Sequence, residues 1–164
     1  MAEPTHILLA SQVLTSGTTS IILSNLSGDY RDLFIKIGGP GGGQITWLQF
    51  NGVETNDYAF GQLSANNGDT GTYNTHQVNQ DKITTHNAYP WSSGSLGQLE
   101  IWVIDYKNTN KWKTTLARFT HGAGAVTLNG GRWESNSAIN EITIGTTSNS
   151  IATGTQIEIY GVGI

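Results

Sequence analysis

Residue types that could carry out chemistry are present in this sequence, but none recurs at a catalytic or metal-binding spacing. There are no cysteines, which excludes disulfides, thiolate nucleophiles and cysteine-based zinc sites. No G-x-S-x-G element is present to expose an activated serine. The Gly-rich segment 38–43 lacks the Lys-Ser/Thr end of a phosphate-binding loop. The histidines form no H-x-H or H-E-x-x-H motif; they are His6, His76, His86 and His121.

Carboxylate pairs are a further catalytic candidate, because jelly-roll glycosidases use two acids about 5–10 Å apart. The nearest candidates are Asp29 with Asp32, Glu54 with Asp57, and Glu100 with Glu158. Each position is also typical of an acid in a turn or on a strand surface, and we favour that interpretation. The segment 66–72 has some calcium-loop character but no acidic ligand follows nearby, so we interpret it as a turn. We therefore predict no enzymatic activity, no metal site and no cofactor.

The charge content limits the partners that the chain could bind. Only 12% of the residues are charged, the net charge is −4 and the pI is about 5.4. Nucleic-acid binding requires many Lys and Arg residues to displace counterions from phosphate. The densest basic group is Lys107, Lys111 and Lys113, and the nearby Asp105 can balance part of its charge. We therefore expect no nucleic-acid partner.

The N-terminal sequence and the hydropathy pattern bear on localisation. The first 14 residues have no basic region, and their apolar run is too short for a secretory signal. No window approaches the roughly 20 apolar residues of a membrane span. We expect a soluble protein, made in the cytoplasm without Sec-type export, that does not contact a membrane.

The elements that must position any site are β-strands. Runs of period-2 alternation recur between turn residues, and no amphipathic helix of ten residues is present. The chain is also rich in Thr, Gly, Asn and Ser, which favour strands and turns. The expected strands lie within 6–14, 18–26, 33–38, 44–52, 98–106, 113–121, 141–145 and 155–164.

These strands predict an all-β fold, a single antiparallel sandwich of jelly-roll type that spans residues 1–164. Residues 1–6 form a short N-terminal arm in this interpretation. The first two strands look like a hairpin, and the glycines of 38–43 predict an irregular connection. The region 65–97 holds either two or three short strands or long loops.

The aromatic residues are the remaining candidates for binding. Trp47 and Trp102 lie in expected strands, and we expect them to fill the core. Tyr73, Tyr89 and Trp91 lie in the polar middle region. They are either core residues under loops or exposed platforms for a sugar or a protein partner.

Four segments resemble recurring blocks of one protein family. They are SNLSGDYRDLFIKI (24–37), LQFNGVETNDYAF (48–60), IDYKNTNKWKTTLARF (104–119) and GGRWESNSAINEITIG (130–145) continued to the end of the chain. In their order and spacing they resemble small Gly/Ser/Thr/Asn-rich virion proteins of tailed bacteriophages, often those of cyanobacteria and marine bacteria. The resemblance covers residues 10–164.

This resemblance implies a virion structural protein without catalytic residues. We expect a capsid decoration (cement) protein that binds the major capsid protein, as a homo-oligomer, trimer or dimer. The alternative is a tail fibre or receptor-binding tip that contacts a host-surface glycan, or a tail adaptor or baseplate component. In either case residues 130–145 are structural: Trp133 caps or fills the sandwich edge, and Arg132 and Glu134 flank it.

Overall fold

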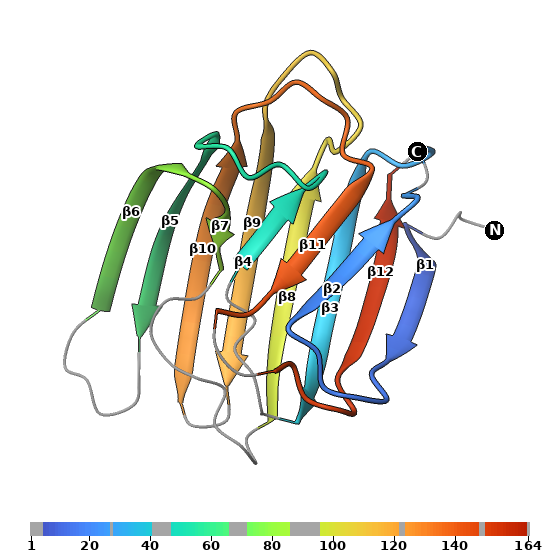
Figure 1. Ribbon diagram of the computed structural model, residues 1–164, viewed down its shortest axis with the longest axis vertical. Helices are drawn as coiled ribbons and strands as arrows, with labels where there is room; N and C mark the ends of the chain where they lie inside the picture. The colour runs from blue at the N-terminus through green and yellow to red at the C-terminus, as the bar shows by residue number, and fades with distance from the viewer. Residues whose placement is uncertain are drawn as a thin grey trace.

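The computed structural model describes residues 5–26, 28–40, 47–65, 72–85, 96–121, 124–147 and 150–163. Within these ranges the chain forms twelve β-strands in two antiparallel sheets and contains no helix. A four-stranded sheet lies against one face of an eight-stranded sheet, in front of it in Figure 1. The prediction of an all-β sandwich is therefore confirmed.

The strand order differs strongly from the chain order. The eight-stranded sheet runs β1 (His6–Val13), β12 (Gln156–Val162), β3 (Asp32–Pro40), β8 (Leu96–Ile104), β9 (Lys113–His121), β10 (Ala125–Trp133), β5 (Tyr58–Ala65), β6 (Thr72–Gln80). The smaller sheet runs β2 (Ser20–Ser24), β11 (Glu141–Gly145), β4 (Trp47–Phe50), β7 (Ile83–Thr84).

The chain crosses repeatedly between the two sheets, and only β5–β6 and β8–β9–β10 are consecutive neighbours. This order excludes a simple up-and-down sandwich, whereas the jelly-roll assignment itself stays a prediction. Among the described residues, no helix is long and apolar enough to cross a membrane.

Period-2 alternation builds the core between the sheets. Alternate residues of β3 point inward and are fully buried, and they pair with buried residues of β8. Burying one such aliphatic side chain contributes about 1.5–3 kcal/mol. The paired residues are Leu33 with Val103, Ile35 with Ile101, and Ile37 with Leu99.

Trp133 lies at the end of β10 in an aromatic cluster of the core. Its side chain is 2% exposed, stacks on Tyr58 at 6.1 Å and contacts Phe50 at 5.6 Å between ring centroids. Arg132 and Glu134 beside it form an ion pair at 2.6 Å. Trp133 therefore has a structural role in the core, which corrects the prediction that it caps or fills the sandwich edge. It does not lie at a sheet edge, because β10 is flanked by β9 and β5.

Asn51 connects the turn after β4 to the segment that leads into β11. Asn51 and Gly52 both have positive φ, 53° and 63°, a conformation that Asn-Gly dipeptides favour in tight turns. The Asn51 side-chain amide donates to the Ala138 carbonyl at 2.8 Å. Its oxygen accepts from the amides of Asn140 and Glu141 at 2.8 and 3.1 Å.

Three further predictions are corrected. The first two strands do not form a hairpin: β1 pairs with β12 and β2 pairs with β11, in different sheets. Neither tryptophan that was expected to fill the core does so fully. Trp102 alternates with the buried Ile101 and Val103 and therefore points to the other face of the sheet. Trp47 is only partly buried. β3 continues through Gly38 to Pro40, because β8 supplies hydrogen-bonding partners that outweigh the low strand propensity of glycine.

Candidate binding surface

The face of the eight-stranded sheet that points away from the four-stranded sheet carries the candidate site, and we call it the outer face. Its side chains occupy the positions that alternate with the core positions. In β3, Ile35 and Ile37 are fully buried, whereas Phe34 and Lys36 are partly exposed. The outer face therefore combines residues from strands that are far apart in the sequence.

A row of alternating charges crosses four neighbouring strands of the outer face, β12, β3, β8 and β9. Direct cross-strand partners place Glu158, Lys36, Glu100 and Arg118 side by side. Arg118 and Glu100 approach to 2.7 Å, and Lys36 and Glu158 to 3.8 Å. Two acids and two bases balance each other, so this row favours neither an anionic nor a cationic partner.

Both carboxylates of this row are held by further donors. Gln98 donates to Glu100 and Gln156 donates to Glu158, each at 2.9 Å. The Tyr160 hydroxyl also donates to Glu158 at 2.9 Å, and this hydrogen bond raises the pKa of Tyr160. Glu100 and Glu158, considered above as a catalytic pair, are thus engaged as strand-surface acids.

An aromatic cluster lies beside the charged row. Phe34 and Trp102 stack at 4.7 Å, and Tyr160 lies 6.1 Å from Phe34. The His6 ring packs edge-on against Phe34 and Trp102 at 5.9 and 5.8 Å. These rings are packed mainly against one another, which stabilises this part of the outer face.

Four large aliphatic side chains are exposed together on β5, β9 and β10, and we call them the aliphatic patch. Leu63 of β5 is directly opposite Leu128 of β10. Val126 lies two residues along β10 on the same face, and Leu116 lies on the neighbouring β9. Their exposed fractions are 48–52%. Contiguous exposed apolar groups of this kind mark interaction surfaces.

The interior beneath this patch is polar. Gln62 and Asn129 are buried cross-strand partners on the inner side of β5 and β10. The Gln62 amide donates to Ser64 at 2.6 Å, and the Asn129 amide donates to the Thr84 carbonyl at 2.7 Å. Here the usual distribution of polar and apolar residues between the two faces of a sheet is reversed.

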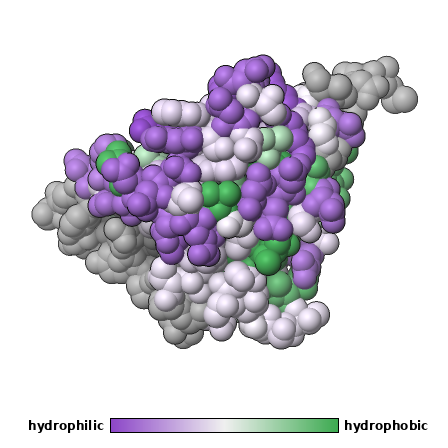
Figure 2. Space-filling view, turned by 45° about the horizontal axis from the view of Figure 1, so that its top comes forward, coloured by the Kyte–Doolittle hydropathy of each residue, from purple (hydrophilic) through white to green (hydrophobic). Residues whose placement is uncertain are grey.

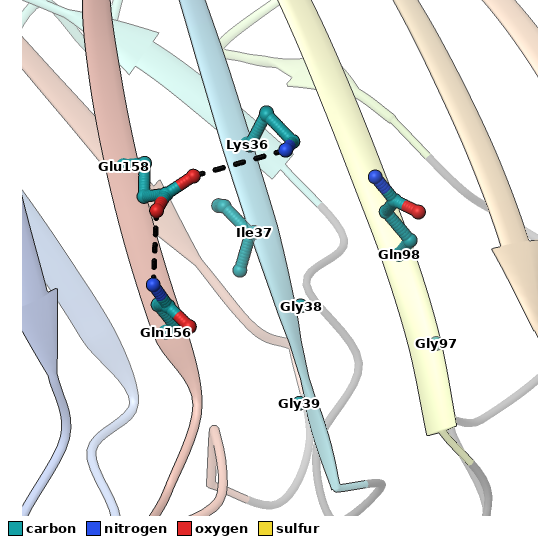
Figure 3. Close-up of a pocket in the computed structure, with 8 residues that line it drawn as sticks. All are labelled: Lys36, Ile37, Gly38, Gly39, Gly97, Gln98, Gln156 and Glu158. Atoms are coloured by element: carbon teal, nitrogen blue, oxygen red, sulfur yellow. Dashed lines mark hydrogen bonds and ion pairs between the residues drawn. The ribbon is translucent and has the colours of Figure 1, made fainter. Parts of the chain in front are cut away.

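The described residues of the outer face line two hollows that are considered in turn. The first, the Gly38 hollow, lies over β12, β3 and β8 and measures about 410 Å³ (Figure 3). Glycines lie at its floor and long polar side chains at its rim. These residues are Gly38, Gly39, Gly97, Lys36, Gln98, Gln156 and Glu158.

The second hollow lies beside the aliphatic patch and measures about 340 Å³. Gly61 and Gly130 face each other at its floor as cross-strand partners, and His76 and Arg132 line it. A Cβ atom at Gly130 would meet nothing within 4 Å. The open floor gives the patch a depression that a projecting partner side chain can enter.

The view in Figure 2 presents a different part of the surface. It is mainly hydrophilic, and its hydrophobic side chains form small separate areas. Ile22 of β2 in the four-stranded sheet is 60% exposed. Because Ile22 is also an exposed aliphatic residue but lies outside the aliphatic patch, it is a suitable control position for substitutions in the patch.

The basic residues around 107–113 do not gather into a cationic surface. The Lys111 ammonium pairs with Asp105, and the Lys107 ammonium donates to Asn140 at 2.6 Å. Lys113 is buried and donates to the Lys111 carbonyl at 3.0 Å, and burial lowers its pKa. Each of these three lysines therefore already has a partner within the chain, and the expectation that the segment does not bind phosphate stays a prediction.

Within the described ranges, no group of three or more His, Asp or Glu residues could hold a metal ion. Asp32, another of the considered acids, is buried. It accepts from Arg31 and from the Asp105 amide at 2.8 Å, so its role is structural. Whether the chain is catalytic stays a matter of proposal.

The aromatic residues that the sequence singled out are placed only in part. Tyr73 lies in β6 opposite Ser64. Tyr89 and Trp91 lie outside the described residues. Of the residues that line the two hollows, the sequence singled out Glu158, His76 and Arg132, but in other roles. The aliphatic patch was not singled out. Strand alternation already puts Gln98 and Glu100 on one face and Leu99 and Ile101 on the other.

Comparison with known proteins finds no matching family model and no matching curated protein. Among solved structures, the alginate lyase Aly36B is 11% identical with a TM-score of 0.32, covering 93% of this chain and 77% of its own. A human SPRY domain is 10% identical with a TM-score of 0.29, covering 93% and 94%. The Aplysia kurodai PL-14 alginate lyase is 8% identical with a TM-score of 0.24, covering 93% and 81%. Likenesses at this level decide neither the fold family nor the activity.

Proposed function

We propose that this chain is a non-enzymatic structural module that docks onto a protein surface through the aliphatic patch. The observation that carries this proposal is the clustering of Leu63, Leu116, Val126 and Leu128, each about half exposed, on three adjacent strands. A partner that covers these side chains removes apolar area from water, which is the main driving force of association. The adjacent hollow over Gly130 adds a place for a complementary side chain.

The composition of the surrounding surface also suits a protein partner. Arg118 and Arg132 lie next to the patch on β9 and β10, opposite Leu128 and Thr114 respectively. An apolar centre with an arginine-bearing polar rim is typical of protein interfaces. Because Arg118 is already paired with Glu100, attachment should depend little on salt.

We further propose that the partner surface belongs to a bacteriophage virion and is the lattice of the major capsid protein. This step rests on the sequence resemblance to phage virion proteins. A decoration protein is repeated over the lattice, so modest contacts are multiplied when it also forms a dimer or trimer. The alternatives are a tail fibre or receptor-binding tip, and a tail adaptor or baseplate component.

Binding to particles tests the docking surface. Purified particles that lack this protein are mixed with the recombinant chain, and the bound fraction is measured by sedimentation. The double variant Leu116→Ser, Leu128→Ser should bind at least tenfold more weakly than the wild type. Ile22→Ser, on the four-stranded sheet, is the matched control and should bind like the wild type. Equal binding by both variants would disprove the role of the patch.

Copy number separates the virion placements. Densitometry of purified particles should give hundreds of copies for a decoration protein, as an order of magnitude from lattice symmetry. A count of about 3–18 would place the protein on the tail instead. Sedimentation velocity of the free chain tests the expected dimer or trimer.

A further inference from the structure

The Gly38 hollow has the form of a small-ligand site that is separate from the aliphatic patch. Gln156, Gly38 and Gln98 lie in one row across β12, β3 and β8. Adjacent strands are about 4.8 Å apart, so the two glutamines stand roughly 10 Å apart with no side chain between them. The volume of about 410 Å³ falls within the range of small-molecule sites.

The rim of the hollow presents fixed acceptors and a donor. Each glutamine uses its amide nitrogen on a carboxylate of its own strand, at 2.9 Å. This contact fixes the orientation of the amide and leaves its carbonyl oxygen available to a ligand. Lys36 lies on β3 two residues before Gly38, in the neighbouring row, and its ammonium lies 3.8 Å from Glu158 (Figure 3). Because this distance is too long for a strong hydrogen bond, the ammonium group can still donate hydrogen bonds to a ligand.

The charges around the hollow select the ligand class. Lys36 lies between Glu158 and Glu100 as their cross-strand neighbour, and Arg118 balances Glu100. An anionic ligand that approaches Lys36 therefore also approaches Glu158. A neutral ligand with neighbouring hydroxyl groups avoids this repulsion, because each hydroxyl both donates and accepts a hydrogen bond. Amide oxygens and a carboxylate can accept from it while the ammonium donates to it.

We propose that the Gly38 hollow binds a neutral saccharide unit, with Gln98 and Gln156 on either side of the ring and Lys36 and Glu158 on its hydroxyl groups. The glycines at the floor let the sugar lie close to the main chain. This site is independent of the docking surface and adds a second binding capacity to the chain. It differs from the aromatic platforms that the sequence suggested.

The test uses the full chain and a panel of defined sugars. Glucose, galactose, mannose and N-acetylglucosamine are titrated against ¹⁵N-labelled protein, with glucuronate as the anionic comparison. At least one neutral sugar should bind with millimolar affinity and shift the amide signals of Gly38, Gly97 and Gln98. Glucuronate should bind more weakly. The absence of shifts with every neutral sugar, or tighter binding of glucuronate, would overturn the proposal.

Two glycine variants give a matched pair. A Cβ atom at Gly38 would meet only the Gly97 carbonyl at 3.8 Å, an ordinary van der Waals contact. Gly38→Val therefore places a branched side chain in the hollow. This variant should bind the sugar at least tenfold more weakly. Gly130→Val adds the same side chain to an equally open position of the outer face and should leave sugar binding unchanged. If Gly38→Val does not fold, Gln156→Ala replaces it and should weaken binding severalfold. Unaltered binding by the folded variant would refute the assignment.

Discussion

Tyr58 should make this fold sensitive to alkaline pH, because its phenol is fully buried in the core. The hydroxyl accepts a hydrogen bond from the Phe50 amide at 3.0 Å and donates to the Val53 carbonyl at 3.2 Å. Burial raises the pKa of Tyr58 from 10.0 to about 12, because the phenolate would lose its hydration inside the protein. The neutral phenol is therefore the form that the fold stabilises.

The size of the effect follows from the difference in pKa between the two states. The unfolded chain releases this proton near pH 10 and the native chain near pH 12. Between these values the native state binds more protons, so the free energy of unfolding falls as the pH rises. One pKa unit corresponds to about 1.36 kcal/mol, so two units give roughly 2–3 kcal/mol. This stabilisation is fully present below pH 10 and is lost as the pH rises through 12.

Tyr58→Phe isolates this contribution from that of the other tyrosines. At neutral pH the variant should be less stable by about 1–3 kcal/mol, because the buried Phe50 amide loses its acceptor. The difference from the wild type should then shrink as the pH rises above 10. Urea denaturation at a series of pH values measures it. Tyr160→Phe, whose hydroxyl lies on the outer face, is the control and should change stability by less than about 0.5 kcal/mol.

A stability difference between the wild type and Tyr58→Phe that stays constant from about pH 9 to 11.5 would refute this reasoning. It would mean that the phenol does not ionise later in the native state than in the unfolded chain. Absorbance titration of tyrosinate in the folded protein provides the independent check, since Tyr58 should ionise after the exposed tyrosines.

Two further substitutions test the turn and a tight backbone approach. Asn51→Ala should destabilise the fold by about 2–4 kcal/mol, because it removes three hydrogen bonds and places alanine at a positive φ. Asn51→Gly should cost less, because glycine tolerates that φ. Equal stability of the two variants in urea denaturation would contradict the contribution assigned to the positive φ. Gly145→Ala should lower the free energy of unfolding by about 1–3 kcal/mol, because a Cβ there would overlap the ring of its cross-strand partner Trp47. Gly130→Ala is the control and should leave stability nearly unchanged. Similar thermal stability of the two variants would count against the observed position of Trp47.

The sequence predicted strands in which side chains alternate with a period of two residues. The ranges expected for 113–121 and 141–145 coincide with β9 and β11. The pairing partners could not be read in this way, because alternation defines the two faces of a strand but not its neighbours. The Gly38 hollow combines residues from β12, β3 and β8, which become adjacent only in the folded sheet. Gly38 and Gly39 were interpreted as part of an irregular connection because glycine is unfavourable in strands, and the pairing with β8 that holds them in the sheet is not visible in the sequence.

β10 shows most directly why part of the candidate surface could not be predicted. Its apolar residues Val126 and Leu128 point outward, and its polar residues Thr127 and Asn129 are buried. The usual rule that apolar residues face the core would therefore assign the two faces of this strand the wrong way round. Gly130 and Gly131 further weaken its strand signal. This reversed orientation is informative, because exposed aliphatic side chains on a strand lower solubility unless a partner covers them.

The magnitude of that contact favours a repeated surface over a single partner molecule. Completing the burial of four side chains that are already about half buried contributes roughly 3–6 kcal/mol, taking 1.5–3 kcal/mol for each full burial. Association of two molecules costs an estimated 4–15 kcal/mol in lost translational and rotational freedom. One patch alone would therefore hold a partner weakly. Two or three patches presented together by an oligomer on a lattice share one such cost, so the second and third contacts contribute nearly in full. A chain variant that stays monomeric should accordingly detach from particles under dilution, while the wild type stays bound.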